Sequence, residues 1–325
     1  MKYRLVVVGA GKIAFAHLEA IKLLKQQLVP VAVADLLEER AQELAAAYGI
    51  RPYTDYKEMV EREKPDIVII TLPHFLHKEA AIYCANQGCH VLLEKPMALT
   101  VLECDEIIAA VHSSNVKLMV GHTQHYISEN RKAKQIIEQG DLGQLVMIND
   151  SRHTDYFNQE RPGWFLQKEL SGGGIITNLG SHSVDKIQWL GGTKIKKVKA
   201  SLSFHGPRGN VEGSGLVFLE NESGTPSTIS QSGYRGAPRN ETELLFTGGM
   251  LMVQTGQALF ISKGGAYEQI SVEKEDSPFV QQFLELMTCI ECDQEPECSM
   301  KYSRSIVAVT NAIYVSHELK IEVIV

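Results

Sequence analysis

The sequence predicts an α/β fold in which an N-terminal doubly wound parallel sheet is followed by a C-terminal α+β domain with a large, open, mostly antiparallel sheet. Apolar runs alternate with helix-like segments through the first 122 residues, which is typical of a parallel sheet covered on both faces. A glycine-rich turn directly follows the first run. Beyond residue 122, strand-like runs are broken by Gly, Asn and Pro, which favours antiparallel strands with short connections.

The N-terminal part alternates regularly between strands and helices. Each expected strand is apolar along most of its length, and two helices end at Gly49 and Gly88, the residue type preferred at a helix C-terminus. These segments predict a first domain of residues 1–122. Strands are expected at 3–8, 29–34, 66–73, 90–96 and 117–122, and helices at 15–25, 38–48, 77–87 and 102–113.

The remainder, residues 123–325, is expected to form the second domain. Its last helix, about 302–317, is expected to pack back on the first domain. An open sheet face needs a cover, so a homodimer or homotetramer is expected. Strands are expected at 144–153, 195–204, 213–220, 224–232, 241–248, 249–255 and 257–263, and helices at 129–139, 178–190, 278–290 and 302–316.

Composition and charge narrow the classes of function. The chain of 325 residues has a formal net charge of −7 and a pI of about 5.9, which argues against nucleic acid or an anionic membrane as the main partner. No apolar stretch is long enough to span a bilayer. The first apolar run stops at a glycine turn, so it is interpreted as a strand and not as a signal peptide. A cytoplasmic protein with reduced cysteines is expected.

No metal site is expected. Cys289 and Cys292 form a Cys-x-x-Cys pair followed by Cys298. However, Cys289 lies in an apolar helical pattern, and neither a second such pair nor clustered histidines follow. A helix end followed by a loop is therefore preferred over a zinc site.

The glycine-rich turn predicts a dinucleotide site. Gly9 allows a tight turn, Gly11 lets a pyrophosphate approach the backbone, and Ala14 allows close packing of the following helix. The second strand ends in Asp35, an acid that hydrogen-bonds ribose hydroxyls and repels a 2′-phosphate. NAD is therefore predicted over NADP. The alternative is a structural glycine turn in which Asp35 caps a helix.

Lys95 lies where the fourth strand leaves the core. Ligands of doubly wound sheets bind outside the carboxyl ends of the strands, and residues 71–74 and 94–96 lie at two such ends. Pro96 restricts Lys95 to an extended backbone, and a Lys–Pro bond can adopt the cis form, which would aim the side chain. Lys95 is therefore predicted to point to the place of a nicotinamide. The alternative is a solvated lysine in a turn.

A second candidate group lies on a helix in the second domain. The glycines at 172–174 precede this helix, on which Asn178, His182 and Asp185 recur at helical spacing. A histidine on a helix is more often structural than catalytic. The glycine run before this helix indicates that the backbone at 172–174 passes close to a neighbouring group. His182 is the candidate general acid or base, because imidazole titrates near neutral pH.

These features together resemble the glucose–fructose oxidoreductase/inositol dehydrogenase (Gfo/Idh/MocA) family over almost the whole chain. The Gly-x-Gly-x-x-Ala turn, Asp35, the Glu-Lys-Pro sequence at 94–96 and the glycine-rich histidine helix carry the resemblance. It implies a Rossmann domain, an open antiparallel sheet, NAD as cofactor, and oxidation or reduction of a sugar, cyclitol or related polyol. It also implies Lys95 and His182 as catalytic residues, with Asn178 beside His182.

Removal of a hydride from a carbinol requires removal of the hydroxyl proton as well. Lys95 would stabilise the oxygen, and His182 would accept the proton. The residues expected at the cofactor are Gly9, Gly11, Lys12, Ile13, Ala14, Asp35, Thr71, Leu72, Pro73, His74, His77, Glu94, Lys95 and Pro96, and those expected at the substrate are His125, Tyr126, His153, Asp155 and Trp164.

The chain departs from the family's pattern at two places. The family usually carries an aspartate at the position of Asn178, and it often has an arginine near His125. An asparagine can orient His182 without adding charge, so His182 would be a weaker base. Two alternatives to a dehydrogenase therefore stay open. One is a dinucleotide-binding regulator without turnover, and the other is an enzyme with retained NAD, either a redox-assisted glycosidase or a sugar–sugar oxidoreductase.

Overall fold

The computed structural model describes residues 2–274 and 276–325, and the chain forms two compact units. Each unit contains one sheet. The first unit consists of 1–123 and 276–304, and the second consists of 124–275 and 305–325.

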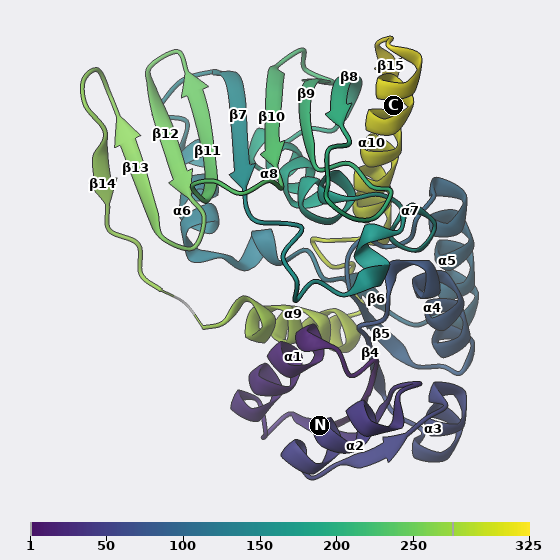
Figure 1. Cartoon of the computed structure of the whole chain (residues 1–325). Helices are drawn as coiled ribbons and strands as arrows, with labels where there is room; N and C mark the ends of the chain where they lie inside the picture. The colour runs from purple at the N-terminus through teal and green to yellow at the C-terminus, as the bar shows by residue number, and fades with distance from the viewer. Residues whose placement is uncertain (1, 275) are drawn as a thin grey trace. The chain divides into compact units, whose positions relative to one another are not determined.

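The first unit is a doubly wound sheet of six parallel strands in the order β3-β2-β1-β4-β5-β6. Figure 1 shows α4 and α5 on one face of this sheet and α1 with α9 on the other. The predicted parallel sheet is confirmed. Its strands are β1 (Tyr3–Val8), β2 (Leu28–Ala34), β3 (Arg51–Tyr53), β4 (Ile67–Ile70), β5 (His90–Leu93) and β6 (Leu118–Val120). Its helices are α1 (Lys12–Leu23), α2 (Glu38–Tyr48), α3 (Tyr56–Glu63), α4 (His77–Asn86), α5 (Val101–Ser114) and α9 (Pro278–Cys292).

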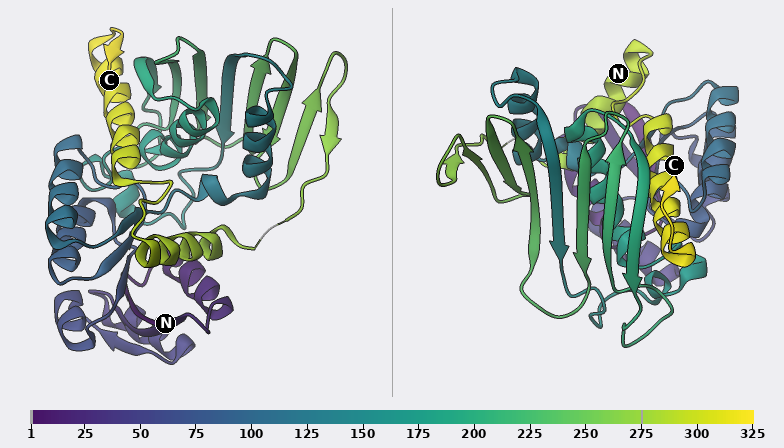
Figure 2. Two further views of the ribbon diagram at one scale, coloured as in Figure 1. Left: turned by 180° about the vertical axis from the view of Figure 1, so that it is seen from behind. Right: turned by 90° about the horizontal axis from the view of Figure 1, so that it is seen from above.

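The second unit contains a sheet of nine strands in the order β14-β13-β12-β11-β7-β10-β9-β8-β15. Only β10 and β7 pair in parallel, so the predicted mostly antiparallel sheet is also confirmed. Helices α6 and α8 lie on the same face of it (Figure 2). The strands are β7 (Leu145–His153), β8 (Ile195–Ser203), β9 (Ser214–Asn221), β10 (Pro226–Ser232), β11 (Arg239–Phe246), β12 (Gly249–Gln254), β13 (Ala258–Ser262), β14 (Glu268–Ile270) and β15 (Val323–Ile324). The α-helices are α6 (Ser128–Gln139), α7 (Lys168–Ser171), α8 (Ser181–Gly191) and α10 (Met300–Leu319).

Alternation along β9 shows why the second sheet has one covered face. Val217 and Leu219 are buried, whereas Leu216 and Phe218 are 66% and 42% exposed. Successive side chains on a strand point to opposite faces, so one face packs on helices and the other stays open. No helix in the described ranges, 2–274 and 276–325, is both long and apolar enough to cross a membrane.

The division into units departs from the prediction near the C-terminus. Residues 276–304, expected in the second domain, belong to the first unit. There α9 packs against α1. The ring of His17 on α1 meets the rings of Phe279 and Phe283 edge-on, with centroid distances of 4.9 and 5.8 Å. The helix expected to pack back, about 302–317, lies mostly in the second unit. Its packing on the first domain stays a prediction.

Candidate functional site

The glycine turn at the end of β1 is held by Thr71, which follows β4. Gly9 has a φ of +101°, and a Cβ there would lie 2.8 Å from the Thr71 carbonyl oxygen. The Thr71 hydroxyl lies 2.7 Å from the Gly9 carbonyl oxygen and 3.1 Å from that of Val8. Gly9 is therefore required by the fold itself. Thr71, expected at the cofactor, uses its hydroxyl to fix this turn.

Gly11 has a different environment, which fits a bound pyrophosphate. It precedes α1 as the N-cap and offers no side-chain cap to that helix. A Cβ on Gly11 would meet no protein atom within 4 Å, so the fold does not itself require glycine here. Gly11 is thus uncrowded at the N-terminus of α1, the kind of position at which proteins bind anions. Ala14 is fully buried beneath this turn.

Asp35 is held by backbone groups at the end of β2. One carboxylate oxygen accepts a 2.8 Å hydrogen bond from the Ala10 N–H, and the other accepts a 2.9 Å bond from the Leu37 N–H. Each carboxylate oxygen can accept a further bond. Asp35 is thus fixed beside the glycine turn with capacity for ribose hydroxyls.

Glu94 fixes the strand end that carries Lys95. One carboxylate oxygen lies 2.9 Å from His17 Nε2, and the other accepts a 3.3 Å hydrogen bond from the Lys95 N–H. Burial acts to raise the pKa of Glu94, but the hydrogen bond to His17 and the charge of Lys95 outweigh it, so the pKa is lowered. The Lys95–Pro96 peptide bond is cis.

If Lys95 is catalytic and the cofactor is NAD, as the sequence predicts, substitution of His17 by Ala is expected to lower kcat about tenfold or more and to leave NAD affinity unchanged, because a small displacement of Lys95 is enough for such a loss. The buried Glu94 would also lose its His17 partner, and its pKa would rise. Steady-state kinetics and NAD titration measure the two effects. His17→Gln keeps a donor and is expected to recover most of the activity. Equal losses in both variants would contradict a positioning role.

His77 joins the two loops that the sequence placed at the strand ends. Its ring is fully buried, with Nδ1 2.8 Å from the Pro96 carbonyl oxygen and Nε2 2.9 Å from that of Leu72. Burial lowers the pKa of His77, whereas the two carbonyl contacts act to raise it. This geometry supports a role in positioning the loops and not the direct cofactor contact expected from the sequence. His74 is also buried, and its ring meets that of His77 edge-on.

In the second unit, the glycine run before α8 passes close to other parts of the protein. Gly173 has a φ of +154°, and a Cβ there would lie 1.9 Å from the Tyr314 hydroxyl oxygen. A Cβ on Gly174 would lie 2.2 Å from the Glu212 carbonyl oxygen. The glycines are therefore explained by packing. Figure 1 shows this region of α7 and α8 beside α10.

Glu212 anchors this glycine run and was not found from the sequence. Its buried carboxylate accepts hydrogen bonds from the N–H groups of Gly174 (2.9 Å) and Ile176 (2.8 Å) and from the Tyr314 hydroxyl (2.8 Å). Burial raises the pKa of Glu212 in spite of these bonds. Glu212 precedes β9 and lies far from the run in sequence, so no local pattern indicated it.

Replacement of Gly173 by alanine is expected to destabilise the protein by more than about 1 kcal/mol, because the φ of Gly173 is unfavourable for any L-residue with a side chain. Overlap of the new Cβ with the Tyr314 hydroxyl adds to this cost. Chemical unfolding measures the effect. Gly224 is the matched control, since its φ is +84° and a Cβ would meet no atom within 4 Å. Gly224→Ala should cost only about 1 kcal/mol. Equal costs at both positions would contradict the Tyr314 contact.

His182 and Asn178 lie at the junction of two helical forms. A π-helical turn, η4 (Ile176–Gly180), leads directly into α8, in place of the single α-helix expected. Such turns are frequent at functional sites. Asn178 is 6% exposed, and burial raises the pKa of the Tyr156 hydroxyl to about 12. His182 is 8% exposed.

The residues expected to line the substrate have different environments. His125 is fully buried. Its Nε2 lies 2.7 Å from a carboxylate oxygen of Asp185, and its ring stacks on that of Trp189 with the centroids 4.4 Å apart. Tyr126 is 2% exposed. His125 holds α8 within the second unit, and the burial of both residues does not support the predicted substrate contact.

Asp155 and Trp164 are more accessible. Asp155 is exposed and lies 3.7 Å from Arg235 Nε. Trp164 stacks on Phe165 at 3.7 Å, and His153 is half-buried at the end of β7. None of these observations assigns a substrate contact, and the three residues stay predictions.

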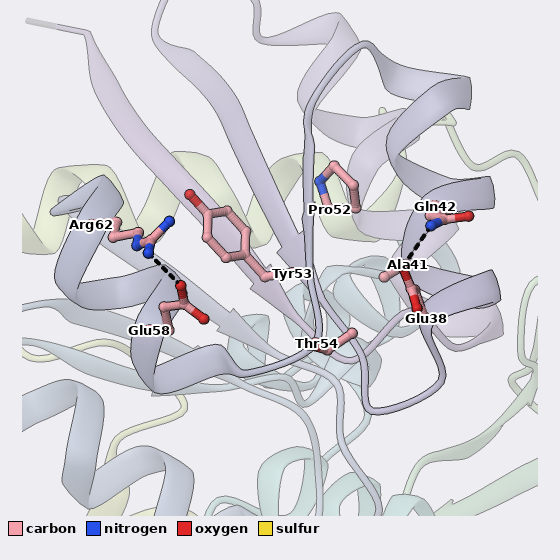
Figure 3. A pocket seen from close by; sticks show the side chains of 8 residues that line it. All are labelled: Glu38, Ala41, Gln42, Pro52, Tyr53, Thr54, Glu58 and Arg62. Atoms are coloured by element: carbon pink, nitrogen blue, oxygen red, sulfur yellow. Dashed lines mark hydrogen bonds and ion pairs between the residues drawn. The ribbon is translucent and has the colours of Figure 1, made fainter.

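The first unit also contains a polar pocket of about 290 Å³ between α2, β3 and α3 (Figure 3). Glu58 and Arg62, two of its lining residues, form a 2.8 Å ion pair. Its lining contains none of the predicted cofactor residues. In the described part of the chain, no group of three or more His, Cys, Asp and Glu residues is arranged to hold a metal ion. The lining residues are Glu38, Ala41, Gln42, Pro52, Tyr53, Thr54, Glu58 and Arg62.

The parallel sheet, the open glycine turn and the fixed Asp35 define a dinucleotide-binding protein of the Rossmann class. Residues 3–122 match the family described as "oxidoreductase family, NAD-binding Rossmann fold". Residues 130–252 match the family described as "GFO/IDH/MocA C-terminal domain". The chain belongs to the glucose–fructose oxidoreductase/inositol dehydrogenase (GFO/IDH/MocA) family, as the sequence motifs predicted.

Known relatives agree with this family. A 2,7-anhydro-N-acetylneuraminate hydratase of Mediterraneibacter gnavus is 30% identical over 65% of this chain and 54% of its own. A myo-inositol 2-dehydrogenase of Thermotoga maritima is 26% identical over 70% of this chain and 68% of its own. A structure of levoglucosan dehydrogenase with NADH and levoglucosan has a TM-score of 0.92, at 19% identity over 100% of both chains, and shows the shared fold. The chain spans about half the length of several curated relatives.

Proposed function

We propose that the protein is an NAD-dependent oxidoreductase that transfers a hydride between the cofactor and a carbinol or carbonyl carbon of a sugar, cyclitol or related polyol. The observation that carries this proposal is the position of Lys95. It follows a parallel strand of the Rossmann unit, and Glu94, with His17 bound to it, fixes its backbone. Relatives named as dehydrogenases of myo-inositol and of levoglucosan support the substrate class.

The residues of the first unit would bind and orient the dinucleotide. The N-terminus of α1 would hold its pyrophosphate, and Asp35 would accept hydrogen bonds from its ribose hydroxyls. When bound, NAD supplies the acceptor for the hydride. Lys95 would place a positive charge beside the substrate oxygen and stabilise the alkoxide as it develops.

NAD is proposed over NADP. The Asp35 carboxylate is held beside the glycine turn by the Ala10 N–H. The next four residues, Leu36, Leu37, Glu38 and Glu39, include no basic residue. A phosphate would therefore meet negative charge. Calorimetry measures the dissociation constants of NAD and NADP, and their ratio tests the preference for NAD.

The residues of the second unit would handle the proton. His182 would accept it from the substrate hydroxyl at a ring nitrogen. Asn178 would orient His182. An asparagine does not stabilise imidazolium as an aspartate would. This observation favours, as a second candidate, an enzyme with retained NAD or a regulator without turnover.

A homodimer or homotetramer is also proposed. Leu216 and Phe218 present apolar surface on the open face of the second sheet, and contiguous exposed apolar surface commonly marks an interface. Light scattering coupled to gel filtration gives the mass in solution. A single mass near 36.1 kDa would contradict the proposal.

The test of the proposed function is NADH formation, followed by absorbance, with a panel of inositols, aldoses, 1,5-anhydro sugars and their carboxylated counterparts. Turnover of any member supports an oxidoreductase. Binding of NAD without turnover of any member would contradict it and would favour a regulator. NAD that co-purifies and resists removal would instead favour the enzyme with retained cofactor.

A further inference from the structure

Three side chains form a row across the middle of the second sheet. Gln231 on β10 pairs with Arg152 on β7, and Arg152 pairs in turn with Asn240 on β11. Asp150, two residues before Arg152, bonds to Ser183 of α8. Side chains two apart on a strand share a face, so the row faces the side of the sheet on which α8 lies.

Each member of this row has a buried polar atom that the protein leaves unsatisfied. Arg152 Nη1, Gln231 Oε1 and Asn240 Oδ1 have no hydrogen-bond partner among residues 2–274 and 276–325. Buried donors and acceptors are nearly always paired. Three such atoms on three adjacent strands therefore indicate a ligand that completes them.

Asp150, whose charge acts on the Arg152 guanidinium, is shared with a second cation, Lys186. Asp150 already accepts hydrogen bonds from Ser183 and Thr242 and forms a 2.8 Å ion pair with Lys186. Burial lowers the pKa of the Arg152 guanidinium, although the charge of Asp150 acts to raise it. A ligand anion would offset the cost of this burial.

The row lies beside the helical turn that carries His182. Gln231 Nε2 donates a 2.9 Å hydrogen bond to the hydroxyl of Ser183, the residue after His182. A Cβ on Gly180 would lie 3.5 Å from Gln231 Oε1. A molecule bound at the row would therefore lie next to the start of α8.

We propose that Arg152, Gln231 and Asn240 form a subsite for a carboxylate flanked by hydroxyl groups, so that the substrate is a sugar acid or polyhydroxy acid. The guanidinium donates to the carboxylate, and the two amide oxygens accept from hydroxyls on either side. A neutral polyol would satisfy the two acceptors but would leave the buried cation uncompensated. This assignment rests on the proposed oxidoreductase function, which supplies the reaction.

The test compares matched substrates that differ only in the carboxylate, glucose with glucuronate and galactose with galacturonate. The wild type is expected to show the higher kcat/KM on the acid of each pair. Arg152→Gln should lower kcat/KM on the acid about 100-fold, mostly through KM, because the carboxylate would be buried without its cation. It should change kcat/KM on the neutral sugar less than about twofold. Arg152→Lys is expected to restore part of the loss.

Arg239→Gln is the matched control. Arg239 precedes Asn240 on β11, so it points to the opposite face, where it is exposed and pairs with Glu241. This variant should behave as the wild type does. Equal losses on acid and neutral members in Arg152→Gln, or a wild-type preference for the neutral members, would overturn the subsite.

A binding measurement separates this inference from the proposed function. If no substrate is oxidised, binding to the row can still be tested. Calorimetry measures whether the protein with NAD binds galacturonate, glucuronate or gluconate. Binding that Arg152→Gln abolishes and Arg239→Gln retains would support the subsite while the oxidoreductase proposal fails. Absence of binding by all three acids would overturn the subsite itself.

Discussion

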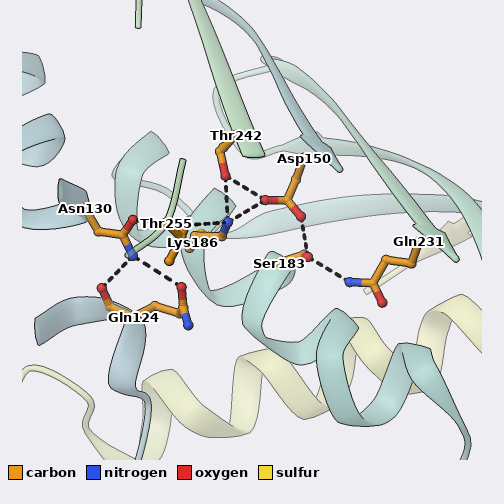
Figure 4. A network of polar contacts seen from close by, with 8 residues as sticks. All are labelled: Gln124, Asn130, Asp150, Ser183, Lys186, Gln231, Thr242 and Thr255. Carbon is orange, nitrogen blue, oxygen red and sulfur yellow. Dashed lines mark hydrogen bonds and ion pairs between the residues drawn. The ribbon is translucent and has the colours of Figure 1, made fainter. Parts of the chain in front are cut away.

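Replacement of Lys186 by methionine is expected to destabilise the second unit by about 3–5 kcal/mol, because it leaves the Asp150 carboxylate buried without its cation. Lys186 and Asp150 are almost fully buried, and their charged atoms lie 2.8 Å apart. Lys186 also donates to the Thr242 and Thr255 hydroxyls, while Asp150 accepts from Thr242 and Ser183 (Figure 4). Urea unfolding at pH 7 measures the difference from the wild type.

Two further variants identify the cause of this loss. The double variant Lys186→Met with Asp150→Leu removes both charges and is expected to be more stable than Lys186→Met alone. Lys197→Met removes a half-exposed lysine that pairs with Glu220 on neighbouring strands, and it should leave the unfolding midpoint almost unchanged. A double variant less stable than Lys186→Met would contradict an unpaired buried charge as the cause.

The same variant has a defined pH dependence. Burial acts to raise the pKa of Asp150, but Lys186, Ser183 and Thr242 outweigh it and lower the pKa below its ordinary value of 3.8. In the wild type the Asp150 carboxylate therefore stabilises the fold fully at pH values above its ordinary pKa of 3.8. This contribution is lost as the pH falls through the lower pKa that Asp150 has in the folded protein. In Lys186→Met, burial would dominate and raise the pKa. The difference in unfolding free energy between the two proteins should then shrink as the pH falls from 7 to 4.

Replacement of Lys95 by alanine is expected to lower kcat about 10²- to 10³-fold, as for loss of one group that stabilises a developing oxyanion. NAD should still bind, because Asp35 and the N-terminus of α1 are unchanged. Steady-state kinetics and calorimetry with NAD measure the two quantities. Lys78→Ala is the control, since Lys78 lies on α4 and forms a surface pair with Glu106. Normal turnover in Lys95→Ala would remove Lys95 from the mechanism.

The sequence predicted the parts of the fold that local pattern determines. The continuous apolar strands, Gly9 and the end of β5 before Lys95 all depend on residues close together in the chain. Short edge strands such as β3, which contains Pro52, carry no such pattern and were missed.

The partners of the motif residues were also missed, for a related reason. Glu212 holds the glycine run from 38 residues away, and His17 holds Glu94 from 77 residues away. Arg152 is one of many basic residues in the sequence, and only the strand register places it between Gln231 and Asn240. Such pairings are decided by the tertiary fold, so spacing alone could not reveal them.

The return of residues 276–304 to the first unit has a consequence for biosynthesis. A ribosome releases strands β7 to β14 of the second sheet before it releases α9, so the first unit cannot be completed until almost the entire chain has been made. Until then the side of α1 that carries His17 lacks Phe279 and Phe283. A gene fragment that ends near residue 122 would express an α/β sheet with this apolar surface uncovered, and aggregation of that fragment is expected.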